Sequence, residues 1–264
     1  MFRHQGPGRS DRHNRLLAAY LATVAGFVNS AAFVLLGEFT SHVTGNVGRF
    51  ANDLAFQQLS AAFAALTMIA AFFAGALIAS GLVESQFAAH TSVAYGGALC
   101  FEVALLALFI TLSQFDGDAA RLHTLQEIVL CMAMGAQNSL VTRLSGAVVR
   151  TTHLTGVITD LGIESARWLR YGYSKLSERV HAQIRRAQSP VERPHAAKAW
   201  LLVTIAIGFA FGSVGGAFAG ARLRAAAMWL PCVAVALSAA YALSTVSRRD
   251  DPARGAAQPG DRPR

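Results

Sequence analysis

Two short segments carry most of the side chains in this sequence that could do chemistry. Residues 40–53 read TSHVTGNVGRFAND, and residues 151–164 read TTHLTGVITDLGIE. Aligned without a gap, they are identical at Thr40 and Thr151, His42 and His153, Thr44 and Thr155, and Gly45 and Gly156. The hydroxyls can hydrogen-bond a small polar solute or ion. Each glycine lets the backbone bend or be approached closely.

The two histidines of these segments allow two interpretations. A free imidazole titrates near neutral pH, so His42 and His153 are candidate proton carriers as well as solute ligands. They could equally be neutral donors that tie each segment to a neighbouring helix. No H-E-x-x-H motif or cysteine cluster supplies a third ligand, so we expect no metal and no cofactor.

Amide side chains accompany both segments. The pattern G-x-x-N-S occurs at 26–30 and at 135–139, where it places Asn29 and Asn138, with two extra residues before the second T-x-H-x-T-G segment. Asn46 directly follows the first Thr-Gly pair. These amides either bind the solute or form interhelical hydrogen bonds, which are typically worth about 0.6 kcal/mol.

Glu102 lies near the middle of a long apolar stretch that contains no other Asp, Glu, Lys or Arg. An ionisable group inside a membrane is costly and by default suggests function. Glu102 is therefore a candidate for proton coupling. The alternative is a permanently protonated side chain that is hydrogen-bonded to a neighbouring helix.

Several functional classes lack support in the sequence. No P-loop is present, so we expect no ATP hydrolysis. No spacing of nucleophile and base points to a catalytic residue, so we expect no enzyme. An intramembrane enzyme acting on lipid is the weakest of the alternatives.

The elements that position these residues are apolar helices. Of the 264 residues, 53% are hydrophobic and only 14% are charged, too few charges to cover a water-exposed surface. About 20 apolar residues span a bilayer. Stretches of that length predict six transmembrane helices at 16–37, 59–83, 91–113, 124–144, 199–221 and 225–247.

The positive charges predict the orientation. Most of the 23 Lys and Arg residues lie in the N-terminal tail (1–15), between 143 and 198, or in the C-terminal tail (248–264). The positive-inside rule then places both termini in the cytoplasm. Residues 174–188 are expected to form a basic amphipathic helix on anionic lipids of the inner leaflet, within a linker of about 167–198. The C-terminal tail is expected to be disordered, and no nucleic-acid binding is expected.

The repeated motifs predict a duplication within the membrane domain, residues 16–247. Each copy holds three spans, about 16–113 and about 124–247, so the second enters the membrane from the opposite side. Inverted repeats of this kind are frequent in secondary transporters, whose sites lie near the midplane at broken segments. The predicted fold is therefore all-α, with two inverted three-helix halves that each contain a broken or re-entrant T-x-H-x-T-G segment.

Residues 26–46 (GFVNSAAFVLLGEFTSHVTGN) and 135–156 (GAQNSLV…RTTHLTG) resemble the YoaK family of bacterial multi-pass membrane proteins. The resemblance extends over about residues 14–247. Many relatives have Asp at the position of Asn29. The family implies a six-helix protein of the bacterial inner membrane, and no established substrate.

Together these patterns favour a secondary transporter or channel-like carrier for a small polar solute or ion. Both motif segments would contact the solute, and Glu102 or the histidines would couple protons. The alternative is a non-transporting scaffold or sensor that acts through a partner at the basic cytoplasmic face. Glycines at 208, 212, 216 and 220 form a face for close helix packing, within one monomer or in a homo-oligomer.

Overall fold

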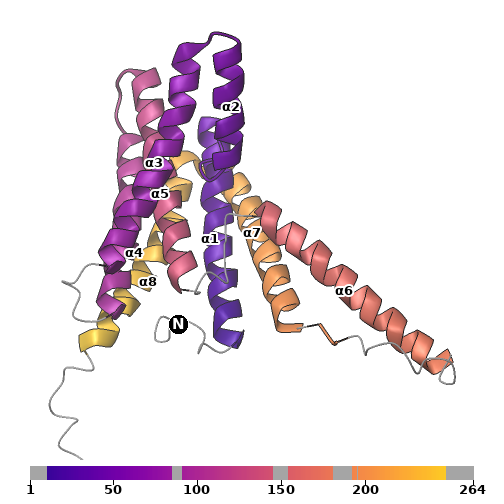
Figure 1. Cartoon of the computed structure of the whole chain (residues 1–264). Coiled ribbons are helices and arrows are strands. Elements are labelled where there is room, and N and C mark those ends of the chain that lie inside the picture. The colour runs from indigo at the N-terminus through magenta and orange to yellow at the C-terminus, as the bar shows by residue number, and fades with distance from the viewer. Residues whose placement is uncertain (1–10, 85–90, 145–153, 181–191, 195, 248–264) are drawn as a thin grey trace, which may run out of the picture. The chain divides into compact units, whose positions relative to one another are not determined.

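Figure 1 shows the computed structural model of the chain, which describes residues 11–84, 91–144, 154–180, 192–194 and 196–247. These residues form helices and no strand, so the predicted all-α class is confirmed for the described part of the chain. The helices are α1 (Asp11–Leu36), α2 (Val43–Ala55), α3 (Leu59–Glu84), α4 (Thr91–Leu112), α5 (Ala119–Leu144), α6 (Leu154–Val180), α7 (Ala196–Leu223), the 3-10 helix η2 (Arg224–Met228) and α8 (Trp229–Ser247).

Four stretches of the described residues are long and apolar enough to cross a membrane. They are Ala18–Leu36, Leu59–Glu84, Val93–Leu112 and Ala196–Ser244. The last stretch is divided between α7 and α8 by η2. Helix α5, which contains the predicted span 124–144, falls outside the four because several charged and amide side chains interrupt its apolar residues.

Local signals explain several helix ends. Gly37 has a φ of +79° and its N–H donates to the carbonyl oxygen of Phe33 at 2.8 Å, a left-handed cap that ends α1. Asp118 caps α5, because its Oδ1 accepts hydrogen bonds from the backbone N–H groups of Ala120 (3.1 Å) and Arg121 (3.4 Å). Arg224, with a φ of +53°, marks the turn between α7 and α8.

The chain divides into two compact units. Unit 1 comprises residues 3–39 and 141–224, and it contains α1, α6 and α7. Unit 2 comprises residues 40–140 and 225–264, and it contains α2, α3, α4, nearly all of α5, and α8. Each unit therefore combines two stretches that are separated in the sequence.

The core of unit 1 is a close packing of α1 against α7. Glycines of α7 lie against the backbone or side chains of α1 at every fourth residue: Gly208 at Ala19, Gly212 at Thr23, Gly216 at Phe27 and Gly220 at Ala31. The contacts advance together along both helices, so the two helices run parallel. The predicted glycine face thus packs within the chain, as small residues do in membrane helix pairs.

Unit 2 contains a second close pair, α3 and α5. A Cβ on Gly75 of α3 would lie 2.0 Å from the carbonyl oxygen of Met132 on α5. On one side of this point, the Cys131 thiol lies 3.8 Å from the Met68 sulfur; on the other, the hydroxyls of Ser80 and Ser139 are 3.0 Å apart. These contacts advance together along both helices, so α3 and α5 also run parallel.

Helices α4 and α8 form the third pair, also in unit 2, and this pair is antiparallel. Gly96 near the start of α4 faces the side chain of Leu243 near the end of α8. Further along α4, the carbonyl oxygen of Val103 accepts a hydrogen bond from the Cys232 thiol near the start of α8, at 3.9 Å. The order of contacts is therefore reversed between the two helices.

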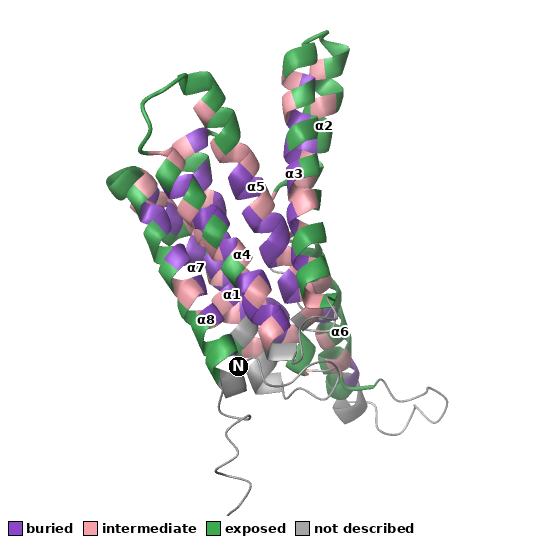
Figure 2. Cartoon of the chain, turned by 90° about the vertical axis from the view of Figure 1, so that its left-hand side faces the viewer, coloured by how far each residue is buried: buried purple, intermediate pink, exposed green. Residues whose placement is uncertain are grey.

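Large apolar side chains are exposed on the outer faces of the helices. Figure 2 shows exposed residues over much of α2 and α3. On α3 they include Phe63, Phe73 and Leu77, and on α7 they include Phe211 and Phe218. Exposed apolar surface of this extent is typical of contact with lipid.

Candidate functional site

The first T-x-H-x-T-G segment lies at the start of a short helix. After Gly37 the chain leaves α1, and α2 begins at Val43 with His42 as its N-cap residue. Helix α2 has only 13 residues, about 20 Å at 1.5 Å per residue, which is too short to cross a bilayer. It packs on α3, to which residues 56–58 connect it (Figure 1). The chain is therefore not α-helical over residues 37–42, between α1 and α2.

The imidazole of His42 folds back over the first turn of α2. A Cβ placed on Gly45 would lie 1.8 Å from Cδ2 and 2.6 Å from Nε2 of this ring. Any other residue at position 45 would displace the imidazole. The spacing H-x-x-G thus has a structural reason, whatever further role the histidine has.

The remaining polar residues of this segment differ in exposure. Thr40 is buried, and its Oγ1 has no hydrogen-bond partner among the described residues. Asn46 is also buried, whereas Thr44 is exposed. Arg49 pairs with Asp53 one turn later, at 3.7 Å from Nε to Oδ2. A buried hydroxyl without a protein partner is costly, so a ligand or water at Thr40 would be favourable.

The second segment is described only from Leu154 onward, so Thr151 and His153 lie outside the described residues. Thr155 and Gly156 form the first turn of α6 and are exposed. Helix α6 continues without a break to Val180. A separate basic helix was expected at 174–188, but residues 174–180 are the last part of α6. Residues 181–188 lie outside the described residues.

The asparagines of the two G-x-x-N-S patterns lie in α1 and α5. Asn29 is buried in α1 of unit 1, and Asn138 is half-buried in α5 of unit 2. Next to it, Gln137 is completely buried, and neither its Oε1 nor its Nε2 has a hydrogen-bond partner among the described residues. Sequence reasoning missed Gln137, although an amide within an apolar stretch was the signal that could have found it.

Glu102 is buried in α4, at 2% exposure. Its Oε2 has no hydrogen-bond partner among the described residues. The next residue, Val103, accepts the thiol hydrogen bond from Cys232 on α8. A carboxyl in such surroundings can bind a proton or a polar ligand, and it is the strongest single candidate for ion chemistry in unit 2.

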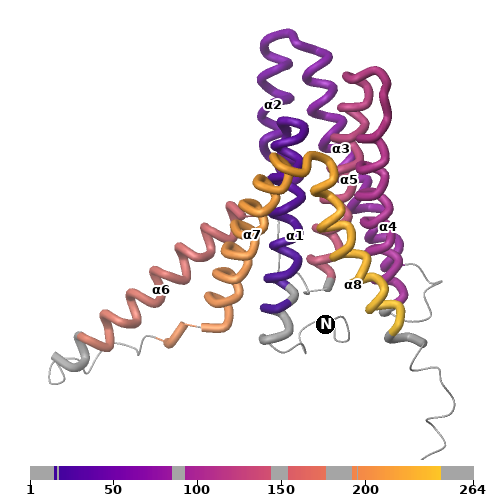
Figure 3. Tube along the Cα trace, turned by 180° about the vertical axis from the view of Figure 1, so that it is seen from behind, coloured from indigo at the N-terminus to yellow at the C-terminus, as the bar shows by residue number. Residues whose placement is uncertain are grey.

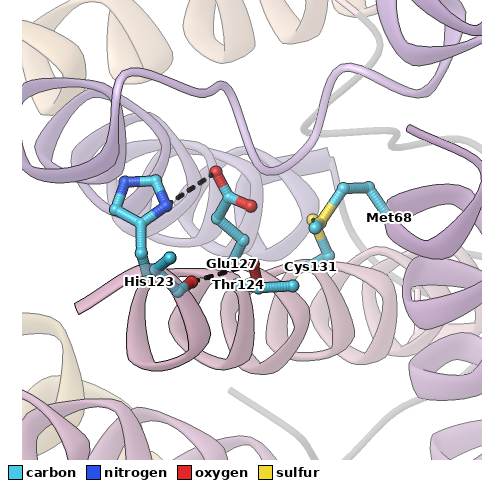
Figure 4. A network of polar contacts seen from close by, with 6 residues as sticks. Met68, His123, Thr124, Glu127 and Cys131 are labelled. Atoms are coloured by element: carbon cyan, nitrogen blue, oxygen red, sulfur yellow. Dashed lines mark hydrogen bonds and ion pairs between the residues drawn. The ribbon is translucent and has the colours of Figure 1, made fainter. Parts of the chain in front are cut away.

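Helix α5 adds a partly exposed pair near its start (Figure 4). Nδ1 of His123 lies 3.4 Å from Oε1 of Glu127, four residues later. Thr124, on the same turn, donates its hydroxyl hydrogen bond to the carbonyl oxygen of Ala120 at 3.1 Å. The described residues contain no group of three or more His, Cys, Asp or Glu side chains that could hold a metal ion.

The candidate residues are divided between the units. Unit 1 holds Asn29, Thr155 and Gly156, and unit 2 holds the first motif segment, Asn138 and Glu102. Within the first motif segment, the imidazole of His42 lies against Gly45, and the backbone N–H of Asn46 donates to the carbonyl oxygen of His42 at 3.0 Å.

A family comparison identifies the chain. The family described as protein of unknown function (DUF1275) matches residues 17–241. The chain belongs to this family. The resemblance to YoaK-like proteins is thereby confirmed, and with its apolar helices this DUF1275 member is a membrane protein.

One curated relative is the UPF0700 transmembrane protein YoaK of Bacillus subtilis (strain 168). It is 28% identical over 150 residues, which are 56% of the DUF1275 chain and 66% of the relative. The chain thus spans just under two thirds of the length of this relative. No solved structure matches the chain.

Proposed function

We propose that this DUF1275 protein is a secondary transporter that moves a small polar solute or ion across the bacterial inner membrane. Its membrane domain would consist of six spans in two inverted halves, with both termini in the cytoplasm. Transport would not use ATP. The observation that carries the proposal is that each unit contains one parallel helix pair built on the same local contacts.

The two pairs correspond residue by residue. In unit 1, a Cβ on Gly26 would meet the carbonyl oxygen of Phe209, and one on Gly212 would meet that of Thr23. In unit 2, a Cβ on Gly135 would meet the carbonyl oxygen of Phe72, and one on Gly75 that of Met132. In each case the contacted residue lies three positions before the partner glycine.

The same pair of glycine–carbonyl contacts in both units supports a duplication within the membrane domain. Gly26 and Gly135 are the equivalent glycines of the two G-x-x-N-S motifs, so α1 corresponds to α5, and the contacts then make α7 correspond to α3. A chance resemblance of short motifs gives no reason for the same pair of glycine–carbonyl contacts to recur. Inverted-topology repeats are a frequent design of secondary transporters.

Helix directions support the six-span arrangement. If six spans alternate in direction, spans one and five are parallel, as are two and four, whereas three and six are antiparallel. These are the directions observed within the pairs α1–α7, α3–α5 and α4–α8. Helix α5 would then cross the membrane as span four despite its polar residues, because its apolar face packs on α3.

The polar groups of each half would serve the solute path. In the first half, these are Thr40, Thr44 and Asn46 around α2, with Glu102 on α4 as the group that exchanges protons. In the second half, they are Thr151, His153 and Thr155 at the start of α6. The buried, unpartnered atoms of Thr40 and Glu102 support this assignment, because a ligand or water would satisfy them.

A cysteine-accessibility scan tests the proposal. The three native cysteines are replaced, single cysteines are placed at positions 40–49 and 151–160, and each is labelled from either side with a membrane-impermeant maleimide. We expect labelled positions in both segments, reached from opposite sides of the membrane. A cysteine at Phe73, on the exposed apolar face of α3, is the control and should remain unlabelled.

Two results would contradict the transporter. Both segments could be sealed against the reagent, or each could be open only at its own surface at every position. Either result would favour the scaffold or sensor.

If the scan succeeds, Glu102→Gln is the next variant, because it keeps the shape of the side chain and removes the titrating proton. We expect loss of proton-coupled flux with the fold retained.

A further inference from the structure

The junction of α6 with the start of α7 in unit 1 is built around one buried carboxylate. Glu164 on α6 is 2% exposed. Its Oε1 accepts hydrogen bonds from Nη1 of Arg167 at 2.9 Å and from Nζ of Lys198, on α7, at 3.1 Å. The hydrogen bond and charge of Lys198, assisted by Arg167, lower the pKa of Glu164. The carboxylate therefore stays ionised and fixes both cations in place.

A hollow of about 420 Å³ opens beside this cluster. Its charged lining consists of Glu164, Arg167, Arg170, Glu192, Arg193 and Lys198. Four cations thus face two carboxylates, so the hollow carries an excess of positive charge. Guanidinium groups offer several N–H donors in a fixed plane, which match the oxygens of a phosphate.

A shallow apolar groove adjoins the basic hollow on the same helix. It is lined by Trp168, Leu169, Tyr173 and Leu176, and Ser165 and Gly172 contribute small residues to it. Leu169 and Tyr173 are 74% and 72% exposed. Toward its C-terminal end, α6 extends away from α7 (Figures 1 and 3).

Trp168 joins the two surfaces. The guanidinium carbon of Arg193, from the hollow, lies 5.9 Å from the centre of the Trp168 ring, and the same ring lines the apolar groove. A ligand that fills both would need a negative group attached directly to a long apolar part. A soluble phosphate would fill only the hollow.

We propose that this surface binds an anionic phospholipid, with its phosphate among Arg170, Arg193 and Lys198 and one acyl chain along the groove. The site does not depend on the transporter proposal, since it lies outside both the T-x-H-x-T-G segments and Glu102. Charge complementarity and the direct continuity of the basic and apolar surfaces favour a lipid as the occupant. Because Trp168 lies between the basic hollow and the apolar groove, we place the headgroup in the hollow and the acyl chain in the groove.

The test uses the full chain with Trp168 as its sole tryptophan, obtained by Trp200→Phe and Trp229→Phe. The protein is reconstituted into phosphatidylcholine vesicles that contain phosphatidylglycerol, with bromine on the acyl chains of one lipid or the other. Bromine quenches a nearby indole. We expect brominated phosphatidylglycerol to quench Trp168 more than its mole fraction predicts, and brominated phosphatidylcholine less.

Replacing Arg170 and Arg193 tests the contribution of the basic groups of the hollow. A basic residue near an anionic surface contributes about 1 kcal/mol, so Arg170→Gln with Arg193→Gln should lower the phosphatidylglycerol preference about 30-fold. The matched control, Arg121→Gln with Arg222→Gln, removes the same charge elsewhere and should keep the preference. In Leu169→Ser with Tyr173→Ser, the quenching should fall although every charge remains.

Two outcomes would overturn the proposal. Equal quenching by the two brominated lipids would mean that the site does not select an anionic lipid. Inorganic phosphate or glycerol phosphate that abolishes the preference at millimolar concentration would assign the hollow to a soluble anion. Circular dichroism of each variant confirms that its helices are intact before the quenching is compared.

Discussion

Gly212→Ala is expected to destabilise the α1–α7 pair. A Cβ at this position would lie 2.0 Å from the carbonyl oxygen of Thr23, whereas ordinary contact begins at 3.4 Å. The obstacle is backbone and cannot rotate away, so the helices must separate by about 1.4 Å, the difference between these two distances. Overpacking of this kind typically costs about 1–3 kcal/mol. A separation of this size also forfeits much of the dispersion energy along the helix crossing.

Gly215→Ala is the matched control. Gly215 lies on the same helix, and a Cβ there would meet the Phe27 ring at 3.7 Å, an ordinary contact. Both variants gain the same helix propensity, about 1 kcal/mol, so the difference between them isolates the overpacking. We expect Gly212→Ala to be less stable than Gly215→Ala by about 1–3 kcal/mol.

The assay is unfolding of the purified protein by sodium dodecyl sulfate in mixed micelles, followed by circular dichroism. Because Gly75 faces Met132 as Gly212 faces Thr23, Gly75→Ala compared with Gly81→Ala should show the same difference in unit 2. Equal stability of Gly212→Ala and Gly215→Ala would refute the close approach of α1 and α7. A large effect at Gly212 with none at Gly75 would refute the correspondence of the two pairs.

Three further predictions concern local contacts. Because folding lowers the pKa of Glu164, its ionised side chain stabilises the fold at every pH above its pKa in the unfolded chain. This stabilisation is lost as the pH falls through the pKa of the folded protein. The stability of Glu164→Gln, measured from about pH 7 to about pH 3, should therefore fall less steeply with acid than that of the unmodified protein. Gly45→Ala should displace the His42 imidazole and speed proteolysis near α2, whereas Gly48→Ala, which meets nothing within 4 Å, should not. Ser80→Ala and Ser139→Ala should show a coupling of about 0.6 kcal/mol in a double-mutant cycle, and additive effects would mean that the hydroxyls do not interact.

The sequence predicted the helical class and the approximate helix bounds, because long apolar stretches are a strong signal. It also predicted the glycine face of α7, with a partner helix either within the chain or in a second subunit. Four glycines at helical spacing specify a surface for close packing, but they carry no information about which helix occupies it. That α1 is the partner emerges only from the structure.

The residue types of the candidate site could be predicted from the sequence. The burial and contacts of these residues could be predicted only in part. The histidine and glycine of the first motif were singled out, but their contact depends on the chain leaving α1 at Gly37 and restarting at Val43. The burial of Gln137 could not be inferred, because it depends on which face of α5 packs on its neighbours. The continuity of α6 was also missed, since polar residues near its start resembled a break.

The pairing of α1 with α7 has a consequence for how the protein is made. Thr23 leaves the ribosome long before Gly212, and at about 5–20 residues per second the interval is roughly 10–40 s. During that time the face of α1 that later receives the glycines of α7 has no α7 to pack against. The packing of unit 1 can therefore be completed only after α7 has been synthesised. A chain that stalls before residue 200 would leave α1 without its partner helix.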